Sequence, residues 1–561
     1  MKMQKMENII AEKILPNVLK PARYVGNELN SIHKDWDKTP LRVALAYPDT
    51  YEIGMSNLGI QILYHILNQQ EGVLAERAFA PWPDLEHLLT TNNLPLTTIE
   101  SFKPLKDLDV IGFSLGHELT YTNLITMLKL GGVPLHSSER GENDPLVLGG
   151  GPCAFNPEPV ADFFDLFVIG EAEEVILEIT DVLRSTLHVL RSDKLKALAN
   201  IQGVYVPGIS QTVTKRYIKD LDSAPYPTRP IVPFIEAVHD RAVIEIMRGC
   251  KWGCKFCQAG WTARPVREKS LGKLLETAAA LVKNTGYEEL SLISLSSSDH
   301  GQIDELARDL AAKYAKQKIN ISLPSLRTNT FSVRLAKAIA RVRPSGVTLA
   351  PEAGTQRLRD VIGKNMSEEQ ILEGVRAAFE EGIASIKLYF MIGLPTETEE
   401  DLVGICNLAR KILETGRAFG KRCRITVNLA TFIPKPHTPF QWEQQIGIDE
   451  TIEKQRFIKS NLKIRGTDIR WHQAEASFLE GVFSRGDRKL SRVIEKAWEL
   501  GARLDAWSEH LKFGLWQKAF AECGIDPREY LRPRDPEEPL PWDFIQTGVP
   551  KEVLLRAAHK D

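Results

Sequence analysis

The sequence predicts an α/β protein that combines a doubly wound parallel sheet, a partial (β/α)6 TIM-like barrel and a helical C-terminal region. Between residues 41 and 185, short apolar runs alternate with segments of helical periodicity, and the same alternation resumes near residue 240. A proline-rich run, APYPTRPIVP, separates the two series. From residue 461 onward the pattern is helical and rich in tryptophan.

The first series predicts a Rossmann-like sheet. Buried strands are expected at 41–48, 109–116, 145–152 and 165–174, where apolar runs end in polar or glycine-rich loops. Ligands of such sheets bind at the carboxyl ends of the strands. The loops expected at that edge are PDTYEIG, SLGHEL, GGGPCAFNPEP and GEAEE.

The second series predicts about six β/α units, which is fewer than the eight of a complete barrel. Its strands are expected at 242–249, 289–299, 318–330, 345–355, 385–397 and 424–440. The whole chain then divides into an N-terminal extension, a first α/β domain, a linker, the barrel and a helical domain. Their expected ranges are 1–40, 41–185, 186–235, 236–460 and 461–561.

The composition is that of an ordinary globular protein. The 561 residues are 43% hydrophobic and 26% charged, and the formal net charge of −2 gives no global basic surplus for binding nucleic acid. The start lacks a signal-peptide pattern, and no apolar run is long enough to predict a membrane span. Only three of the seven cysteines cluster, which is typical of a cytoplasmic protein with one metal or redox site.

The three clustered cysteines predict an iron–sulfur site. Cys250, Cys254 and Cys257 have the spacing C-x₃-C-x₂-C within RGCKWGCKFCQAG. Three thiolates can hold three irons of a [4Fe–4S] cluster and leave the fourth iron open to another ligand. A zinc knuckle would need a nearby fourth ligand, and the next downstream histidine is the distant His300.

This cysteine motif, with GLPTET at 393–398, resembles the radical S-adenosylmethionine (SAM) superfamily. The resemblance implies reductive cleavage of SAM to methionine and a 5′-deoxyadenosyl radical. It also implies that Phe256 lies near the adenine of SAM and that the serine run with Ser296 and Ser298 binds its amino group. By the same resemblance, Arg327 binds the carboxylate and Glu352 contacts the ribose. The alternatives are a core-edge salt bridge for Arg327 and a strand-end cap for the serines.

The first α/β domain resembles the cobalamin-binding domain of one branch of that superfamily. PDTYEIG is similar to the D-x-H-x-x-G loop, FSLGHEL to the S-x-L loop and LGGGP to the glycine loop at the nucleotide tail. VIGEAEE is also usual in this branch. The residues that carry the resemblance are Asp49, Gly54, Ser114, Leu115, Gly149, Gly150, Gly151, Gly170 and Glu171.

Tyr51 departs from the motif, because it stands where the motif has the histidine that ligates cobalt. A neutral tyrosine is a poor cobalt ligand compared with imidazole. The cobalt is then expected to be five-coordinate above Tyr51 or to bind water, with His65 and His117 as alternative ligands. The alternative to cobalamin binding is a degenerate Rossmann-like domain that binds no ligand.

PARYVGNELN, RGCKWGCKFCQAGW and FIPKPHTPFQW, with other C-terminal motifs, resemble one bacterial family of cobalamin-binding radical SAM proteins of unassigned function. This resemblance implies an electron donor such as flavodoxin or ferredoxin, and a small partner protein encoded nearby. Lys435 and His437 either face the substrate or belong to a stiff exit loop.

The leading functional hypothesis is cobalamin-dependent methyl transfer to an unactivated carbon of an unidentified substrate. The alternatives are a cobalamin-assisted rearrangement or cyclisation without methyl transfer, an RNA-modifying radical SAM enzyme, and a non-enzymatic sensor of cobalamin or iron. The N-terminal domain holds only Cys153 and lacks a second cysteine triplet, which argues against an RNA methylthiotransferase.

Overall fold

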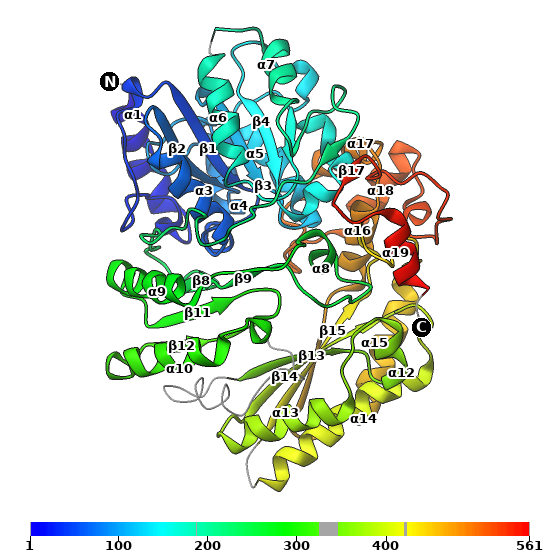
Figure 1. Ribbon diagram of the computed structural model, residues 1–561. Coiled ribbons are helices and arrows are strands. Elements are labelled where there is room, and N and C mark those ends of the chain that lie inside the picture. The colour runs from blue at the N-terminus through cyan, green and yellow to red at the C-terminus, as the bar shows by residue number, and fades with distance from the viewer. Residues whose placement is uncertain (1, 187, 325–345, 420–422, 560–561) are drawn as a thin grey trace.

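The structure is a computed structural model that describes residues 2–186, 188–324, 346–419 and 423–559. Arg327, which the sequence predicts as a SAM ligand, lies outside the described residues. Figure 1 shows the N-terminal sheet region in blue and cyan, a second α/β region in green and yellow, and the C-terminal helices in orange and red. Among the described residues, no helix is both long enough and apolar enough to cross a bilayer.

The N-terminal region contains a six-stranded sheet with the order β2-β1-β3-β4-β5-β6. Its neighbouring strands pair in parallel, except for β6, which is antiparallel to β5. The strands are β1 (Leu41–Tyr47), β2 (Val73–Phe79), β3 (Val110–Ser114), β4 (Leu146–Gly150), β5 (Leu166–Val168) and β6 (Val204–Tyr205). The predicted doubly wound sheet is therefore present, and four of its strands lie within predicted ranges.

The sequence analysis missed β2, because the charged pair Glu76 and Arg77 interrupts its apolar run. In the structure every residue of β2 is buried. Glu76 accepts hydrogen bonds from the hydroxyls of Thr98 and Ser101, at 2.5 and 2.7 Å. Arg77 has buried carboxylate partners of its own. Paired charges can be buried where unpaired ones cannot, so β2 is buried along its whole length at the edge of the sheet despite its polar sequence.

The two faces of this sheet are covered differently. The helices α3 (Leu58–Gln69) and α6 (Val175–Ser185) share a hydrophobic cluster with Val43 and Leu45 of β1. The opposite face, with Ala44 and Ala46, packs into a second cluster. That cluster includes residues of α5 (Tyr121–Leu130), α16 (Ala474–Ser484), α17 (Leu490–Glu499) and α18 (Phe513–Cys523). The C-terminal helices thus help to complete the core of the N-terminal sheet region (Figure 1).

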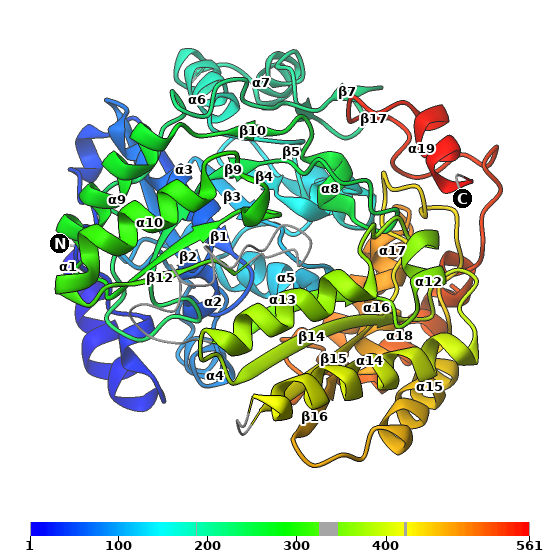
Figure 2. The same ribbon diagram turned by 60° about the horizontal axis from the view of Figure 1, so that its bottom comes forward.

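The barrel region contains two parallel sheets within the described residues, with the orders β12-β11-β8 and β13-β14-β15-β16. Figure 2 shows several of their strands with helices running beside them. The strands are β8 (Ala242–Glu245), β11 (Glu289–Ile293), β12 (Asn320–Ser322), β13 (Val347–Glu352), β14 (Ser385–Ile392), β15 (Arg424–Thr431) and β16 (Thr467–Trp471). The helices that follow them are α9 (Leu271–Thr285), α10 (Ile303–Tyr314), α13 (Glu368–Glu380), α14 (Glu399–Ala418) and α15 (Ile448–Asn461).

Two expectations about the ends of the barrel differ from the structure. The strand β16 lies beyond residue 460, where a helical domain was expected, because its sequence TDIRW is too polar to suggest a buried strand. The proline-rich run at 224–233, expected as an exposed linker, is packed: Tyr226 and Ile231 are buried, and the Tyr226 hydroxyl donates to the Val243 carbonyl at 2.8 Å.

The short elements near the cysteines and at the C-terminus complete the fold. They are β7 (Val213–Thr214), β9 (Met247–Arg248), α8 (Gln258–Thr262), β10 (Arg267–Glu268), β17 (Ile545–Gln546) and α19 (Lys551–Ala558). The strand β17 pairs with β7, so the C-terminal segment returns to the N-terminal half of the chain. Trp516 and Trp542 are buried, whereas Trp471 of β16 is 38% exposed.

Candidate functional site

The three clustered cysteines lie on the loop between β9 and α8, just after the first strands of the barrel region. Cys254 is buried, and Cys250 and Cys257 are partly exposed. The backbone N–H of Gly260 donates to the Cys257 sulfur at 3.3 Å. Burial raises the pKa of the Cys257 thiol to about 11, and the neighbouring Cys254 and Cys250 contribute to this rise. Burial and mutual repulsion therefore oppose deprotonation of these thiols. Bound iron would stabilise the three thiolates, so the loop fits an iron–sulfur site.

Two of the predicted SAM-binding residues, Glu352 and Phe256, lie at this loop, and a third, Ser296, follows the strand β11. Glu352 ends β13 with a φ of +68°, and its charge acts on Cys257. A positive φ in a non-glycine residue is strained and is common at functional sites. Phe256 packs against the apolar cluster that contains Ala353 and Phe440. The Ser296 hydroxyl is buried and has no hydrogen-bond partner among the described residues, so it has the capacity to bind a polar ligand group.

The N-terminal sheet region contains a cavity of about 420 Å³. One wall is the sheet face with Val43, Leu45, Val110, Leu148 and Val168, and the other includes Ile62 and Leu63 of α3 and Ile176 of α6. The cavity also reaches Glu245, Arg248 and Ile293 of the barrel region. An apolar cavity with a few charged groups at one end is typical of a cofactor site.

Glycines of the sheet make room for this cavity. Gly112 and Gly150 line it, and a Cβ atom at either position would come no closer than 3.8 Å to its neighbours. Gly149 instead faces away, because its Cβ would lie 2.7 Å from the Phe167 ring. Of the residues that carry the cobalamin resemblance, those that line the cavity are Ser114, Leu115, Gly150, Gly151 and Gly170.

The loop after β1 does not contribute its predicted residues to the cavity. Asp49, Tyr51 and Gly54 are not among the described residues that line it. The Asp49 carboxylate accepts a 2.9 Å hydrogen bond from the indole of Trp507. The Tyr51 hydroxyl donates to Glu28 at 2.7 Å. Gly54 lies against Phe79, where a Cβ would come within 2.3 Å of the ring. The predicted position of Tyr51 beneath a cobalt atom thus finds no support in its contacts.

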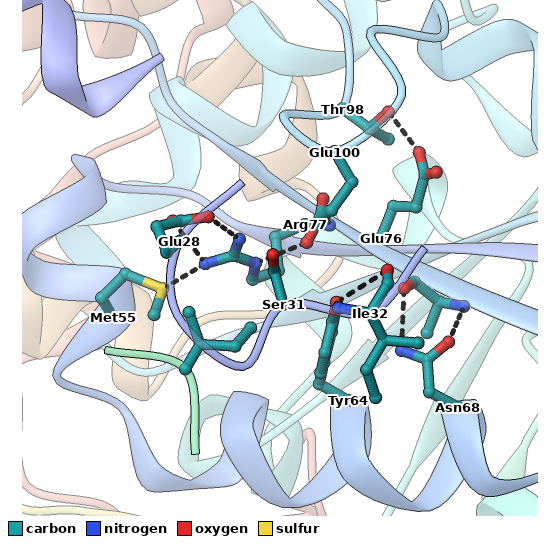
Figure 3. Close-up of polar contacts among 12 residues, drawn as sticks. Glu28, Ser31, Ile32, Met55, Tyr64, Asn68, Glu76, Arg77, Thr98 and Glu100 are labelled. Atoms are coloured by element: carbon teal, nitrogen blue, oxygen red, sulfur yellow. Dashed lines mark hydrogen bonds and ion pairs between the residues drawn. The ribbon is translucent and has the colours of Figure 1, made fainter. Parts of the chain in front are cut away.

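A buried ion network explains this arrangement (Figure 3). The Arg77 guanidinium lies 2.7 Å from a Glu28 oxygen and 2.6 Å from a Glu100 oxygen, and all three side chains are almost fully buried. Glu28 belongs to the N-terminal extension, whereas Arg77 is in β2. Arg23 of the same extension pairs with Glu52 at 2.8 Å. These ion pairs attach residues 1–40 to the sheet region.

Glu171, which is also outside the described cavity lining, connects the N-terminal region with the cysteine loop. Its carboxylate lies 2.7 Å from Arg267 and 3.2 Å from Arg248. Arg248 directly precedes Gly249 and Cys250, and it also pairs with Glu173 and Glu245, which line the cavity. Sequence reasoning missed these two arginines, although both flank the cysteine motif, because the partner carboxylates come from a distant segment.

Lys435 joins three segments rather than projecting freely. Its ammonium lies 2.8 Å from Glu118 and 2.9 Å from Glu480 of α16. Neither glutamate was predicted, since nothing local in the sequence links them to Lys435. His437 is buried, and its Nε2 lies 2.9 Å from the Phe155 carbonyl oxygen. Burial lowers the pKa of His437 to about 4, so the ring is neutral and Nε2–H donates.

Neither of the two alternative cobalt ligands is among the described residues that line the cavity. His65 on α3 contacts the Gln69 side chain at 2.9 Å. His117 accepts the Leu119 N–H at Nδ1, and its Nε2 lies 3.4 Å from Glu480. Burial lowers the pKa of His117, but the Glu480 contact outweighs burial and raises it. His117, Glu118 and Glu480 are close enough to share a cation, and the Lys435 ammonium already supplies one.

Comparison with known proteins agrees with this architecture. Residues 244–409 match the radical SAM superfamily, and residues 59–207 match the region described as radical SAM proteins, N-terminal. The chain is 30% identical over 458 residues to the uncharacterized protein MJ0966 of Methanocaldococcus jannaschii, covering 81% of this chain and 90% of that protein. It is 24% identical over 322 residues to the uncharacterized methyltransferase PH0819 of Pyrococcus horikoshii, covering 56% and 66% of the two chains.

Among solved structures, the fold is similar to that of the cobalamin-dependent SAM radical enzyme OxsB with aqua-cobalamin and SAM bound. The TM-score is 0.53 at 12% identity, and the match covers 91% of this chain and 76% of that one. This likeness confirms the predicted fold class. The radical SAM match implies a [4Fe–4S] cluster and SAM as cofactors. With its cysteine triplet at the end of a parallel strand series, the chain belongs to the radical SAM superfamily, in one family with the M. jannaschii protein.

Proposed function

We propose that the protein is a cobalamin-dependent radical SAM methyltransferase that acts on an unactivated carbon of its substrate. The observation that carries the proposal is the continuity of the N-terminal cavity with the cysteine loop. The cavity is lined by the sheet glycines at one end and by Arg248 at the other, and Arg248 is two residues from Cys250. Two cofactors bound at these places would be neighbours in one chain.

The residues of the barrel region fit the [4Fe–4S] cluster and SAM. Cys250, Cys254 and Cys257 would hold the cluster, and the buried Ser296 hydroxyl would bind the amino group of SAM. Glu352 would contact the ribose from the end of β13. When bound, the cluster supplies the electron that cleaves SAM, and cobalamin supplies a carrier for the methyl group.

The residues of the N-terminal cavity fit the tail of cobalamin. The apolar wall excludes water, and Gly112 and Gly150 leave space beside the strands for a planar group. Gly151 and Ser114, at the rim, offer backbone and hydroxyl groups for the polar part of the nucleotide. The lower face of the cobalt would then receive no side chain from Tyr51, whose hydroxyl is held by Glu28.

The cellular setting follows from the same chemistry. A reduced cluster requires a strong reductant, so the enzyme works in the cytoplasm with an electron donor such as flavodoxin or ferredoxin. The resemblance to a family with a small companion protein suggests a further partner encoded nearby. None of these partners is needed to test the cofactors themselves.

The test begins with protein purified without oxygen from cells supplied with cobalamin. We expect about four irons per chain after reconstitution and about one cobalamin. Cys250→Ala should lose the cluster, whereas Cys406→Ala, at a buried cysteine on α14, should keep it. A full cluster without cobalamin would contradict the proposal. Once a substrate is found, a product heavier by one methyl group supports methyl transfer, and a product without an added methyl group would indicate rearrangement or cyclisation instead.

A further inference from the structure

One arginine, Arg264, donates hydrogen bonds to the backbone at two points of the cysteine loop. The guanidinium of Arg264 donates to the Gly260 carbonyl at 3.0 Å through Nε and to the Trp252 carbonyl at 3.2 Å through Nη2. Its central carbon lies 4.0 Å from the centre of the Trp261 ring. Trp252 stands between the first two cysteines, and Gly260 follows the third. Arg264 therefore spans both ends of the loop.

Neighbouring cations hold Arg264 in this place. The Lys215 ammonium donates to the carbonyls of Thr262 and Arg264, at 2.7 and 2.6 Å. Arg267 donates to the carbonyls of Ala263 and Pro265, at 3.2 and 3.0 Å. The backbone on both sides of Arg264 is thus fixed. Gly249 allows this segment to approach, because a Cβ there would lie 2.7 Å from the Pro265 oxygen.

The fixed charge is close enough to act on the cluster ligands. Burial lowers the pKa of Arg264, and the charge of Cys250 opposes that effect. Hydrogen bonds, net charge and solvent exposure set the reduction potential of an iron–sulfur cluster. The reduced cluster is more negative than the oxidised cluster, so a nearby positive charge favours the reduced state. This interaction is screened less in a partly buried site than in open water.

We propose that Arg264 is a positioning residue whose positive charge, held against the cysteine loop, raises the reduction potential of the cluster. The inference rests on the cluster of the proposed function and extends it. Arg264 touches neither substrate nor SAM in this account. It orders the loop through the Trp252 and Gly260 carbonyls and makes the cluster easier to reduce.

The experiment compares Arg264→Gln and Arg264→Lys with the wild-type protein. Each full-length protein is reconstituted without SAM, and the midpoint potential is measured by a redox titration followed by electron paramagnetic resonance. We expect Arg264→Gln to lower the ratio of reduced to oxidised cluster at least tenfold at a fixed potential, a shift of about 59 mV. Arg264→Lys keeps the charge and should stay close to the wild-type value.

The matched control is Arg308→Gln, which removes a positive charge from an exposed ion pair on α10. It should leave the potential unchanged. If Arg264→Gln does not retain the cluster, iron per chain becomes the readout, and Arg264→Lys should restore it. Lysine and glutamine variants that behave alike, in potential or in iron content, would overturn the proposal. A wild-type protein that fails to bind about four irons would instead remove the proposed function itself.

Discussion

The hydroxyl of Tyr51 donates a 2.7 Å hydrogen bond to the carboxylate of Glu28, and both side chains are buried. Glu28 also pairs with Arg77, so Tyr51 is part of the network that attaches the N-terminal extension to the sheet region. Burial raises the pKa of Tyr51 far above its ordinary value, which keeps the hydroxyl protonated as a donor. The residue that the cobalamin-loop resemblance aligns with a cobalt-ligating histidine therefore has a structural partner in this chain.

Tyr51→Phe should therefore destabilise the protein without weakening cobalamin binding. Loss of a buried hydrogen bond to a charged group costs about 1.5–3 kcal/mol. Denaturant unfolding would measure the stability, and absorbance titration would measure the affinity for hydroxocobalamin. Tyr314→Phe is the matched control, because the buried Tyr314 hydroxyl has no partner among the residues that the structure describes. A loss of affinity at unchanged stability would show that Tyr51 does face the cofactor.

Gly112→Val should block the N-terminal cavity while the fold remains intact. The new Cβ fits, since its nearest neighbour, the Ala44 oxygen, lies 3.8 Å away, and the side chain projects into the cavity. We expect cobalamin affinity to fall at least about tenfold, a change of about 1.4 kcal/mol. Gly149→Val, on the opposite face, should instead lower the melting temperature by overpacking against Phe167. Unchanged affinity in Gly112→Val would place the cofactor elsewhere.

His437 should make the protein sensitive to mild acid. Its pKa in the folded chain is about 4, below the ordinary value of 6.5, because burial opposes the charged ring. The unfolded chain therefore takes up the proton first, and stability is fully present above pH 6.5. It should decline by about 3 kcal/mol as the pH falls from 6.5 to about 4. Melting temperatures at pH 7.5 and pH 5 would measure the first part of the decline, about 2 kcal/mol, which should be smaller in His437→Asn.

Glu171→Gln should loosen the attachment of the N-terminal region to the cysteine loop. The substitution leaves Arg267 and Arg248 without one shared carboxylate in a largely buried network, and hydrogen bonds to charged groups contribute about 1.5–3 kcal/mol. Denaturant unfolding would measure the cost, and iron release to a chelator should also become faster. Glu305→Gln in an exposed pair with Arg308 is the control, with an expected cost under about 1 kcal/mol. Equal costs in the two variants would contradict a role for Glu171 in holding the two regions together.

Apolar runs predicted most of the strands, because a strand buried on both faces shows an almost continuous hydrophobic sequence. This worked for β1, β3, β4 and β5. It failed for β2 and β16, where charged residues interrupt the run. In β2 the partners that allow Glu76 and Arg77 to be buried come from other segments, and local sequence does not reveal them.

The cysteine loop was determined by the sequence alone. Its three cysteines are neighbours along the chain, so their spacing alone predicts a cluster site. The tertiary structure decided the rest. It placed Tyr51 on Glu28, Glu171 on two arginines and Lys435 between two glutamates, and it enclosed the cavity between a sheet face and two helices. These arrangements depend on contacts between residues far apart in sequence, which form only when folding brings their elements together.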